Sequence, residues 1–232
     1  MAGIERAGVC VVVPAFNEEA SLEGLVRGVQ EKGFDVLVVD DGSSDQTLRK
    51  AEALKAKTLA LPANGGKGTA LRKAFEWLLR RPYSVVVLMD ADGQHDPSEI
   101  DRFLCALGRD GVGVAVGNRM HDPEGMPWIR RLTNRFLSWI LSRLTGQNIP
   151  DSQCGYRAMK REVLESITLT TARFETESEM LLEAARKGFA IGSVPIRCVY
   201  HGGKSRIHPL ADTWRFFRFL AGYLLRRRDD AV

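Results

Sequence analysis

Apolar runs and amphipathic segments alternate along the first half of the chain. Runs rich in β-branched residues predict strands at 9–13, 36–39, 84–89 and 112–116, with a shorter strand at 59–61. Apolar residues at helical spacing predict helices at 18–28, 47–56, 69–79 and 97–107. Alternating strands and helices predict an α/β fold with a mostly parallel sheet, and strands that are apolar throughout indicate that helices flank both of its faces.

The second half of the chain is more helical and more basic. Helices are expected at 128–144, 160–166, 174–188 and 210–225. The net charge of the whole chain is only +4, yet the segment 126–145 has four arginines and no acid. The segment 196–228 has eight basic residues and one acid. Such a basic surface could meet nucleic acid, anionic lipid or a phosphorylated substrate. No stacking or zinc motif supports nucleic acid as a partner.

Length and composition are those of a globular protein with a hydrophobic core, since 44% of the 232 residues are hydrophobic. No apolar run reaches the roughly 18–20 residues that span a bilayer, and the first residues lack the shape of a signal peptide. The four cysteines are far apart and fit no zinc spacing. We interpret them as reduced thiols of a cytosolic protein.

Polar clusters follow three of the predicted strands: Pro14-Ala15-Phe16-Asn17-Glu18, Asp40-Asp41-Gly42-Ser43 and Asp90-Ala91-Asp92. The carboxyl ends of parallel strands meet at one edge of a sheet, where open α/β sheets bind ligands, so we expect one site there. Asp90 and Asp92 suit a hard divalent ion such as Mg²⁺ or Mn²⁺ that also binds substrate phosphates. Gln94 could add a neutral oxygen ligand, and His95 is interpreted as a local hydrogen-bonding residue.

The other motifs also have purely structural interpretations. Asp40-Asp41-Gly42 could be a capped turn, but two adjacent acids repel, and a ribose or base edge would supply their partners. Asn64-Gly65-Gly66-Lys67-Gly68 resembles a phosphate-binding loop at a helix start, although a structural glycine turn is at least as plausible. Ser152 and Arg157 could bind an anion or belong to a capped helix start. Of the acids in 175–179, at least one could face the site.

Together these motifs resemble the family 2 inverting glycosyltransferases with the GT-A fold, and within them the polyprenyl-phosphate sugar synthases such as dolichyl-phosphate mannosyl- and glucosyltransferases. The resemblance covers nearly the whole chain. The matching stretches occur in family order and are VVPAFNEE (12–19), VVDDGSSD (38–45), NGGKGTAL (64–71), MDADGQH (89–95), GNR (117–119), DSQCGYR (151–157) and GKSRI (203–207).

The resemblance implies a GT-A nucleotide-diphospho-sugar transferase domain over 1–208, followed by a basic amphipathic helix and tail over 209–232. It implies inverting transfer of a hexose from a nucleoside diphosphate sugar, of GDP-mannose or UDP-glucose type, to polyprenyl or dolichyl phosphate, with Mg²⁺ or Mn²⁺ as cofactor. Such an acceptor is already largely ionised and needs little help from a base.

Two other functions stay open from the sequence. One is transfer to a saccharide or other lipid hydroxyl, for which Glu177 or Glu179 would be the candidate base. The other is a non-catalytic subunit that binds nucleotide sugars. Loss of the acidic pair would favour this second function, and the pair is intact here.

Residue roles carry over from the matching stretches. The nucleotide-sugar contacts would be Pro14, Ala15, Phe16, Glu18, Val39, Asp41, Lys67, Asp90, Ala91, Asp92, Gln94, Arg119, Lys204 and Arg206. Asp92 and Gln94 would hold the metal. The acceptor phosphate would be bound by Arg119, Ser152 and Arg157, and the catalytic groups would be Asp92, Arg119 and Arg157.

Many members of the resembled family carry C-terminal transmembrane helices that this sequence lacks. We therefore expect peripheral contact with the cytoplasmic face of the membrane, with or without a separate membrane subunit, and two segments suit such contact. In 128–144 one helical face would carry Trp128, Leu132, Phe136, Trp139 and Ile140, with Arg131 and Arg135 opposite. In 210–225 one face would carry Leu210, Trp214, Phe217, Leu220, Ala221 and Leu224, with Arg215, Arg218 and Arg226 opposite. The alternative is that both apolar faces pack on the core.

Overall fold

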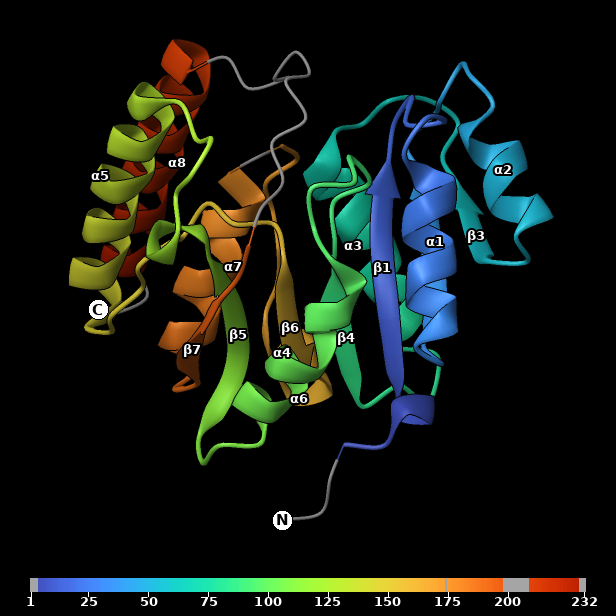
Figure 1. The fold of residues 1–232 in the computed structure, drawn as a ribbon. Coiled ribbons are helices and arrows are strands. Elements are labelled where there is room, and N and C mark those ends of the chain that lie inside the picture. The colour runs from blue at the N-terminus through green and yellow to red at the C-terminus, as the bar shows by residue number, and fades with distance from the viewer. Residues whose placement is uncertain (1–3, 174, 198–208, 230–232) are drawn as a thin grey trace.

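A seven-stranded sheet forms the centre of the computed structural model, which describes residues 4–173, 175–197 and 209–229 (Figure 1). The strands are β1 (Val9–Ala15), β2 (Asp35–Asp40), β3 (Lys57–Ala60), β4 (Val85–Leu88), β5 (Val112–Asn118), β6 (Arg157–Lys160) and β7 (Ala190–Pro195). They follow the order β3-β2-β1-β4-β6-β5-β7, and neighbours are parallel except that β6 is antiparallel to both β4 and β5. The expected α/β fold with a mostly parallel sheet is confirmed.

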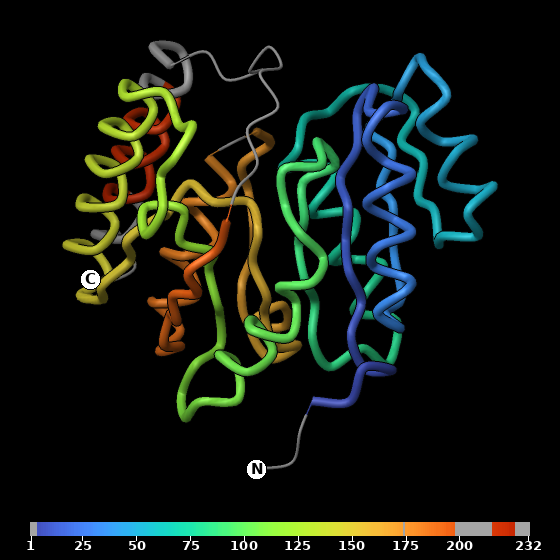
Figure 2. Tube along the Cα trace, viewed as in Figure 1, coloured from blue at the N-terminus to red at the C-terminus, as the bar shows by residue number. Residues whose placement is uncertain are grey.

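Helices flank this sheet. They are α1 (Leu22–Glu31), α2 (Thr47–Ala53), α3 (Lys67–Leu78), α4 (Ile100–Leu107), α5 (Trp128–Thr145), α6 (Arg161–Ser166), α7 (Glu175–Arg186) and α8 (Pro209–Asp229), with short 3₁₀ turns η1 (Arg6–Gly8), η2 (Pro97–Glu99) and η3 (Arg119–His121). Strands β1 and β4 are buried along almost their whole length, which requires cover on both faces. The long helices α5 and α8 lie side by side at the β7 end of the sheet (Figures 1 and 2).

Three strand features differ from the expectation. Strand β1 does not stop at Pro14 but continues to Ala15, pairing there with β2. Its pairing with β4 ends at Val12 opposite Leu88, so the N–H that proline lacks is not needed on that side. Strands β6 and β7 were not expected, because β6 is four residues long and begins with a buried arginine, and most of β7 is only half-buried.

The C-terminal helix packs on α7, and four of its side chains are buried: Phe216, Phe219, Leu220 and Tyr223. The single apolar face expected in 210–225 is therefore wrong: Leu220 is buried, whereas Phe217 and Leu224 are exposed. The side chains of Leu210, Trp214 and Arg226 lie outside the part of the chain that the structure describes. Within the described residues, no helix combines the length and apolar character needed to cross a membrane.

Gly68, in the first turn of α3, lies against the segment that precedes α7. A Cβ on Gly68 would lie 2.6 Å from the Ala172 carbonyl carbon and would overlap Thr176 Oγ1. Gly68→Ala should therefore lower the free energy of unfolding by about 1–3 kcal/mol in a urea titration. Gly24→Ala is the matched control in α1, where nothing lies within 4 Å of the new Cβ, and it should stabilise the protein by roughly 0.5–1 kcal/mol. Equal effects of the two substitutions would contradict this close approach.

Candidate active site

The loops that follow β1, β2 and β4 are bonded to one another. The N–H of Glu18 donates to Thr47 Oγ1 at 2.9 Å, which joins the first loop to the start of α2. Ser21 Oγ donates to the carbonyl oxygen of Ala91 at 2.6 Å, which joins the first loop to the loop after β4. The three polar clusters therefore meet at one edge of the sheet, as the sequence predicted.

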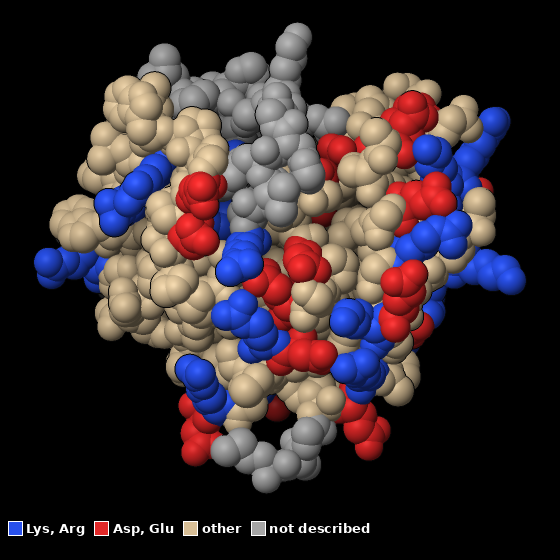
Figure 3. Space-filling view, in the orientation of Figure 1, with Lys and Arg blue, Asp and Glu red and all other residues tan. Residues whose placement is uncertain are grey.

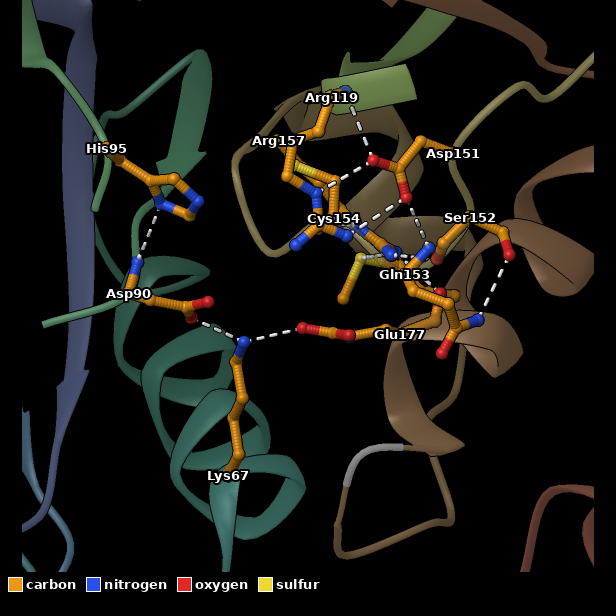
Figure 4. A network of polar contacts seen from close by, with 11 residues as sticks. Lys67, Asp90, His95, Arg119, Asp151, Ser152, Gln153, Cys154, Arg157 and Glu177 are labelled. Carbon is orange, nitrogen blue, oxygen red and sulfur yellow. Dashed lines mark hydrogen bonds and ion pairs between the residues drawn. The ribbon is translucent and has the colours of Figure 1, made fainter. Parts of the chain in front are cut away.

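Lys67 lies between two carboxylates at this edge (Figure 4). Its Nζ is 2.5 Å from Asp90 Oδ1 and 2.5 Å from Glu177 Oε1. One ammonium thus joins the start of α3, the end of β4 and the first turn of α7. Burial opposes charge on both Lys67 and Asp90, but their attraction raises the pKa of Lys67 and lowers the pKa of Asp90 to about 2. Both groups are therefore charged at neutral pH.

Asp90 is also held through its backbone and by close packing. Its N–H donates to His95 Nδ1 at 3.3 Å, and the His95 ring stacks on Tyr156 with centroids 5.0 Å apart. Burial lowers the pKa of His95, in keeping with a neutral ring that accepts a hydrogen bond. The expected local hydrogen-bonding role of His95 is confirmed. A Cβ on Gly155 would lie 2.8 Å from the Asp90 carboxyl carbon, so any other residue there would displace this carboxylate.

The glycine loop 64–68 is a structural turn. The N–H groups of Gly65 and Gly66 donate to the two carboxylate oxygens of Asp41 at 2.9 and 2.8 Å. The N–H of Gly68 donates to the Ala172 carbonyl oxygen at 2.9 Å. The N–H groups of the three glycines are thus bonded to the protein itself. Their bonds fix the start of α3, from which Lys67 extends.

The adjacent acids after β2 have different surroundings. Asp41 is buried, and its carboxylate oxygens accept the N–H groups of the glycine loop. Asp40 accepts the Ser43 N–H at 3.2 Å through Oδ2, whereas its buried Oδ1 has no hydrogen-bond partner in the described structure. A buried oxygen without a partner is costly. Asp40 Oδ1 is therefore an acceptor that the described part of the fold leaves unused, and its burial keeps it from a ligand in this structure.

Arg119 is buried in an ion pair with Asp151. Its Nε lies 2.8 Å from Asp151 Oδ2, and its Nη2 lies 3.0 Å from Oδ1. The neighbouring Ser152 is also buried, and its N–H donates to Ser138 Oγ at 2.8 Å. These contacts belong to the interior of the protein and hold the loop 151–155 in place (Figure 4).

Arg157 is fully buried, and its guanidinium donates to three carbonyl oxygens. They belong to Ser152, Cys154 and Glu177, at 2.7, 2.7 and 2.5 Å. The structure brings together the three residues expected to bind the acceptor phosphate, but it buries them and pairs them with protein groups. Arg157 joins the loop 151–155 to the first turn of α7, and this arrangement leaves no exposed guanidinium edge for a phosphate.

Asp92 is the exposed carboxylate of the expected metal site. It follows β4, and its Oδ1 accepts the N–H of Gln94 at 3.0 Å. In the described part of the chain, no group of three or more His, Cys, Asp or Glu residues could hold a metal ion. One exposed carboxylate and a nearby amide fit Mg²⁺ or Mn²⁺, which keep waters and take other ligands from substrate phosphates.

The other expected nucleotide contacts differ in burial or lie outside the described residues. Buried residues are Ala15, Val39 and Ala91. Half-buried residues at the end of β1 and in the following loop are Pro14, Phe16 and Glu18. Lys204 and Arg206 lie outside the described residues. Sequence reasoning missed Asp151 and Gly155: both belong to the recognised motif at 151–157, but spacing does not reveal their contacts with Arg119 and Asp90.

The profile of glycosyl transferase family 2 matches residues 10–168. The polyprenol monophosphomannose synthase of Mycolicibacterium smegmatis is 35% identical over 201 residues, covering 80% of this chain and 75% of that protein. The UDP-N-acetylglucosamine–dolichyl-phosphate N-acetylglucosaminyltransferase of Methanococcus voltae is 31% identical over 219 residues, covering 83% and 86%. The undecaprenyl-phosphate mannosyltransferase of Micrococcus luteus is 33% identical over 206 residues, covering 82% and 83%.

Among solved structures, the glucosyl-3-phosphoglycerate synthase of Mycobacterium tuberculosis, in complex with Mn²⁺, UDP and glucosyl-3-phosphoglycerate, aligns with a TM-score of 0.69. Its sequence is 22% identical, and the alignment covers 96% of this chain and 80% of that chain. At this identity the likeness is one of fold, and it confirms the expected GT-A fold.

Without the Lys67 ammonium, Asp90 and Glu177 would be two largely buried carboxylates with no cation between them. Lys67→Met should therefore lower the free energy of unfolding by about 3–5 kcal/mol, measured by urea denaturation. Lys73→Met is the matched control, because Lys73 and Glu76 form an exposed ion pair on the same helix. It should cost at most about 0.5 kcal/mol. Equal losses in the two variants would refute the role given to Lys67.

Proposed function

The chain belongs to glycosyl transferase family 2, and we propose that it moves a hexose from a nucleoside diphosphate sugar, of GDP-mannose or UDP-glucose type, to polyprenyl phosphate. The acceptor class named in its relatives carries this proposal. Their names specify polyprenol, dolichyl phosphate and undecaprenyl phosphate, while the transferred sugar varies. The product would be a sugar joined to the lipid through its phosphate, with inversion at the anomeric carbon.

In this proposal the donor binds at the carboxyl edge of the sheet. Phe16 and Glu18, which are half-buried in the loop after β1, would contact the base and the ribose. Asp92 and Gln94 would hold Mg²⁺ or Mn²⁺, which when bound neutralises charge on the departing nucleoside diphosphate. Lys67 keeps Asp90 ionised and fixed in place beside this site. Lys204 and Arg206 remain candidates for contacts to the diphosphate.

An acceptor phosphate needs no protein base, because its attacking oxygen already carries negative charge. That oxygen would bond to the anomeric carbon as the bond from this carbon to the diphosphate breaks. The two candidate bases for a hydroxyl acceptor are already engaged. Glu179 accepts the N–H groups and the hydroxyls of Thr170 and Thr171. Glu177 is paired with Lys67. These contacts support a phosphate acceptor over a saccharide or other hydroxyl acceptor.

Arg119 and Arg157 take a revised role in this proposal. Both are buried and bonded to protein groups, so they would position the loop 151–155 and the start of α7 without binding the acceptor phosphate themselves. Their removal would act on catalysis through Glu177 and Asp90, which those elements place.

The lipid acceptor places the reaction at a membrane surface, and we propose its cytoplasmic face. Cys105 is an exposed free thiol, and Cys10 and Cys154 are buried free thiols, which suits a reducing compartment. A separate membrane subunit is not required by this proposal, and neither is nucleic acid.

A transfer assay tests the proposed function. The protein is incubated with radiolabelled UDP- or GDP-sugars, short-chain polyprenyl phosphate in detergent, and Mg²⁺ or Mn²⁺, with EDTA as the control. We expect one donor to give a labelled glycolipid that EDTA abolishes. Donor hydrolysis without lipid product would move the proposal to another acceptor, and the lack of any donor turnover would favour a non-catalytic binding subunit.

Asp92→Ala should abolish the metal-dependent transfer, with a loss on the order of 10²-fold or more in kcat/KM, because the ion would lose its protein carboxylate. Asp110→Ala is the control, since Asp110 is exposed in the same way but precedes β5, at the opposite edge of the sheet. Transfer at the wild-type rate by Asp92→Ala would remove Asp92 from the metal site.

A further inference from the structure

Helix α5 has two apolar sides, and only one of them packs on the protein. Leu137 and Leu141 are buried against the core. On the outward side Trp128 is 73% exposed, Leu132 64% and Trp139 56%. These outward residues, together with Phe136, recur every three or four positions and therefore form one stripe along the helix. A packed surface helix normally presents polar residues there, so this stripe requires an explanation.

Helix α8 extends this stripe. Phe217, Leu224 and Leu225 are exposed, and the rings of Phe136 and Phe217 lie 6.4 Å apart between centroids. The opposite side of α8 is anchored, since Phe216, Phe219, Leu220 and Tyr223 are buried. We call the exposed apolar residues of both helices the α5–α8 surface; they are Trp128, Ile129, Leu132, Phe136, Trp139, Phe217, Leu224 and Leu225.

Arginines adjoin the α5–α8 surface. Arg131, Arg135 and Arg143 of α5 and Arg218 of α8 are exposed, and no acidic residue occurs between Trp128 and Thr145. At 100° per residue, Arg131 and Arg135 border the Trp128–Trp139 stripe, so their expected place on the opposite face of the helix is wrong. In Figure 3 the side formed by α5 is mainly uncharged, with separate basic side chains. The surface is therefore apolar at its centre and positive at its border.

We propose that the α5–α8 surface inserts shallowly into a bilayer that contains anionic lipid. The chemistry of the surface identifies this partner. Tryptophan side chains suit the boundary between acyl chains and headgroups, and neighbouring arginines suit negatively charged headgroups. A second copy of this chain would bring a second set of arginines against the first, which like-charge repulsion opposes. This inference rests on the proposed function for its purpose, because a membrane-bound acceptor would then lie beside the enzyme.

The orientation of the helices agrees with this docking. Helix α5 begins near the edge at which β1 ends, and the site lies along that edge (Figure 1). Trp128, the most exposed of the large apolar side chains, is the first residue of α5. A bilayer that covers the α5–α8 surface would therefore extend toward the carboxyl edge of the sheet, where the acceptor phosphate has to arrive.

Vesicle co-sedimentation of the full chain tests the inference without any donor sugar. The probes are vesicles of phosphatidylcholine alone and of phosphatidylcholine mixed with phosphatidylglycerol. The aromatic variant is Trp128→Ser with Phe136→Ser and Trp139→Ser, all at exposed positions. Its control is Leu79→Ser, an exposed apolar residue of the segment after α3. The charge variant is Arg131→Glu with Arg135→Glu, and its control is Arg80→Glu with Arg109→Glu, also exposed.

We expect the wild-type protein to prefer the anionic vesicles. The aromatic variant should lose about tenfold or more in partition coefficient, the charge variant should lose the anionic preference, and both controls should bind as wild type does. Equal binding by all variants, or no binding by the wild type, would overturn the inference. A wild-type dimer in sedimentation velocity that the aromatic variant abolishes would also overturn it and assign the surface to a second copy.

Transfer to short-chain polyprenyl phosphate in detergent separates this inference from the proposed function. The aromatic variant should keep the wild-type detergent activity, because it changes no residue of the candidate site, and this activity also shows that it folds. Vesicle binding without transfer would remove the proposed function but leave the docking surface. Transfer in detergent without vesicle binding would remove the docking surface but leave the proposed function.

Discussion

The Lys67 ammonium between Asp90 and Glu177 is the contact on which the site depends. Two carboxylates this close repel strongly where water is scarce, so the end of β4 and the start of α7 can approach only with a cation between them. Asp41 and the Ala172 carbonyl fix the start of α3 and thereby aim Lys67. The glycine loop therefore places a cation between the two acids.

The polar residues at the carboxyl edge of the sheet fall into two groups, which differ in how far they are bonded to the protein. Asp41, Asp90, Arg119 and Arg157 are bonded to the protein and hold loops in place. Asp92 is exposed, and one oxygen of Asp40 has no hydrogen-bond partner in the described structure. In the proposed function, the metal would bind at Asp92, which the buried network leaves available, on a frame that exists before the metal binds.

Much of this arrangement follows from the sequence. Apolar strands that each end in polar residues predict the sheet and the edge at which the three polar clusters meet, because that pattern depends only on local periodicity. Strand β6 escaped notice because four residues with an arginine and a lysine carry no strand pattern. The hydrogen bonds of Asp41 and Arg157 to the protein could not be predicted either, because motif spacing identifies residues at a site but not their partners. Their partners lie in segments far away in the chain and are known only once the fold is known.

In the proposed reaction the acceptor supplies its own charged oxygen, and no carboxylate of this chain acts as base. A competition assay tests this claim most directly. The enzyme is given its donor sugar, Mg²⁺, and equal amounts of polyprenyl phosphate and free polyprenol of the same chain length, and the products are resolved by mass spectrometry. We expect sugar on the polyprenyl phosphate alone. Sugar on the free polyprenol would contradict this expectation.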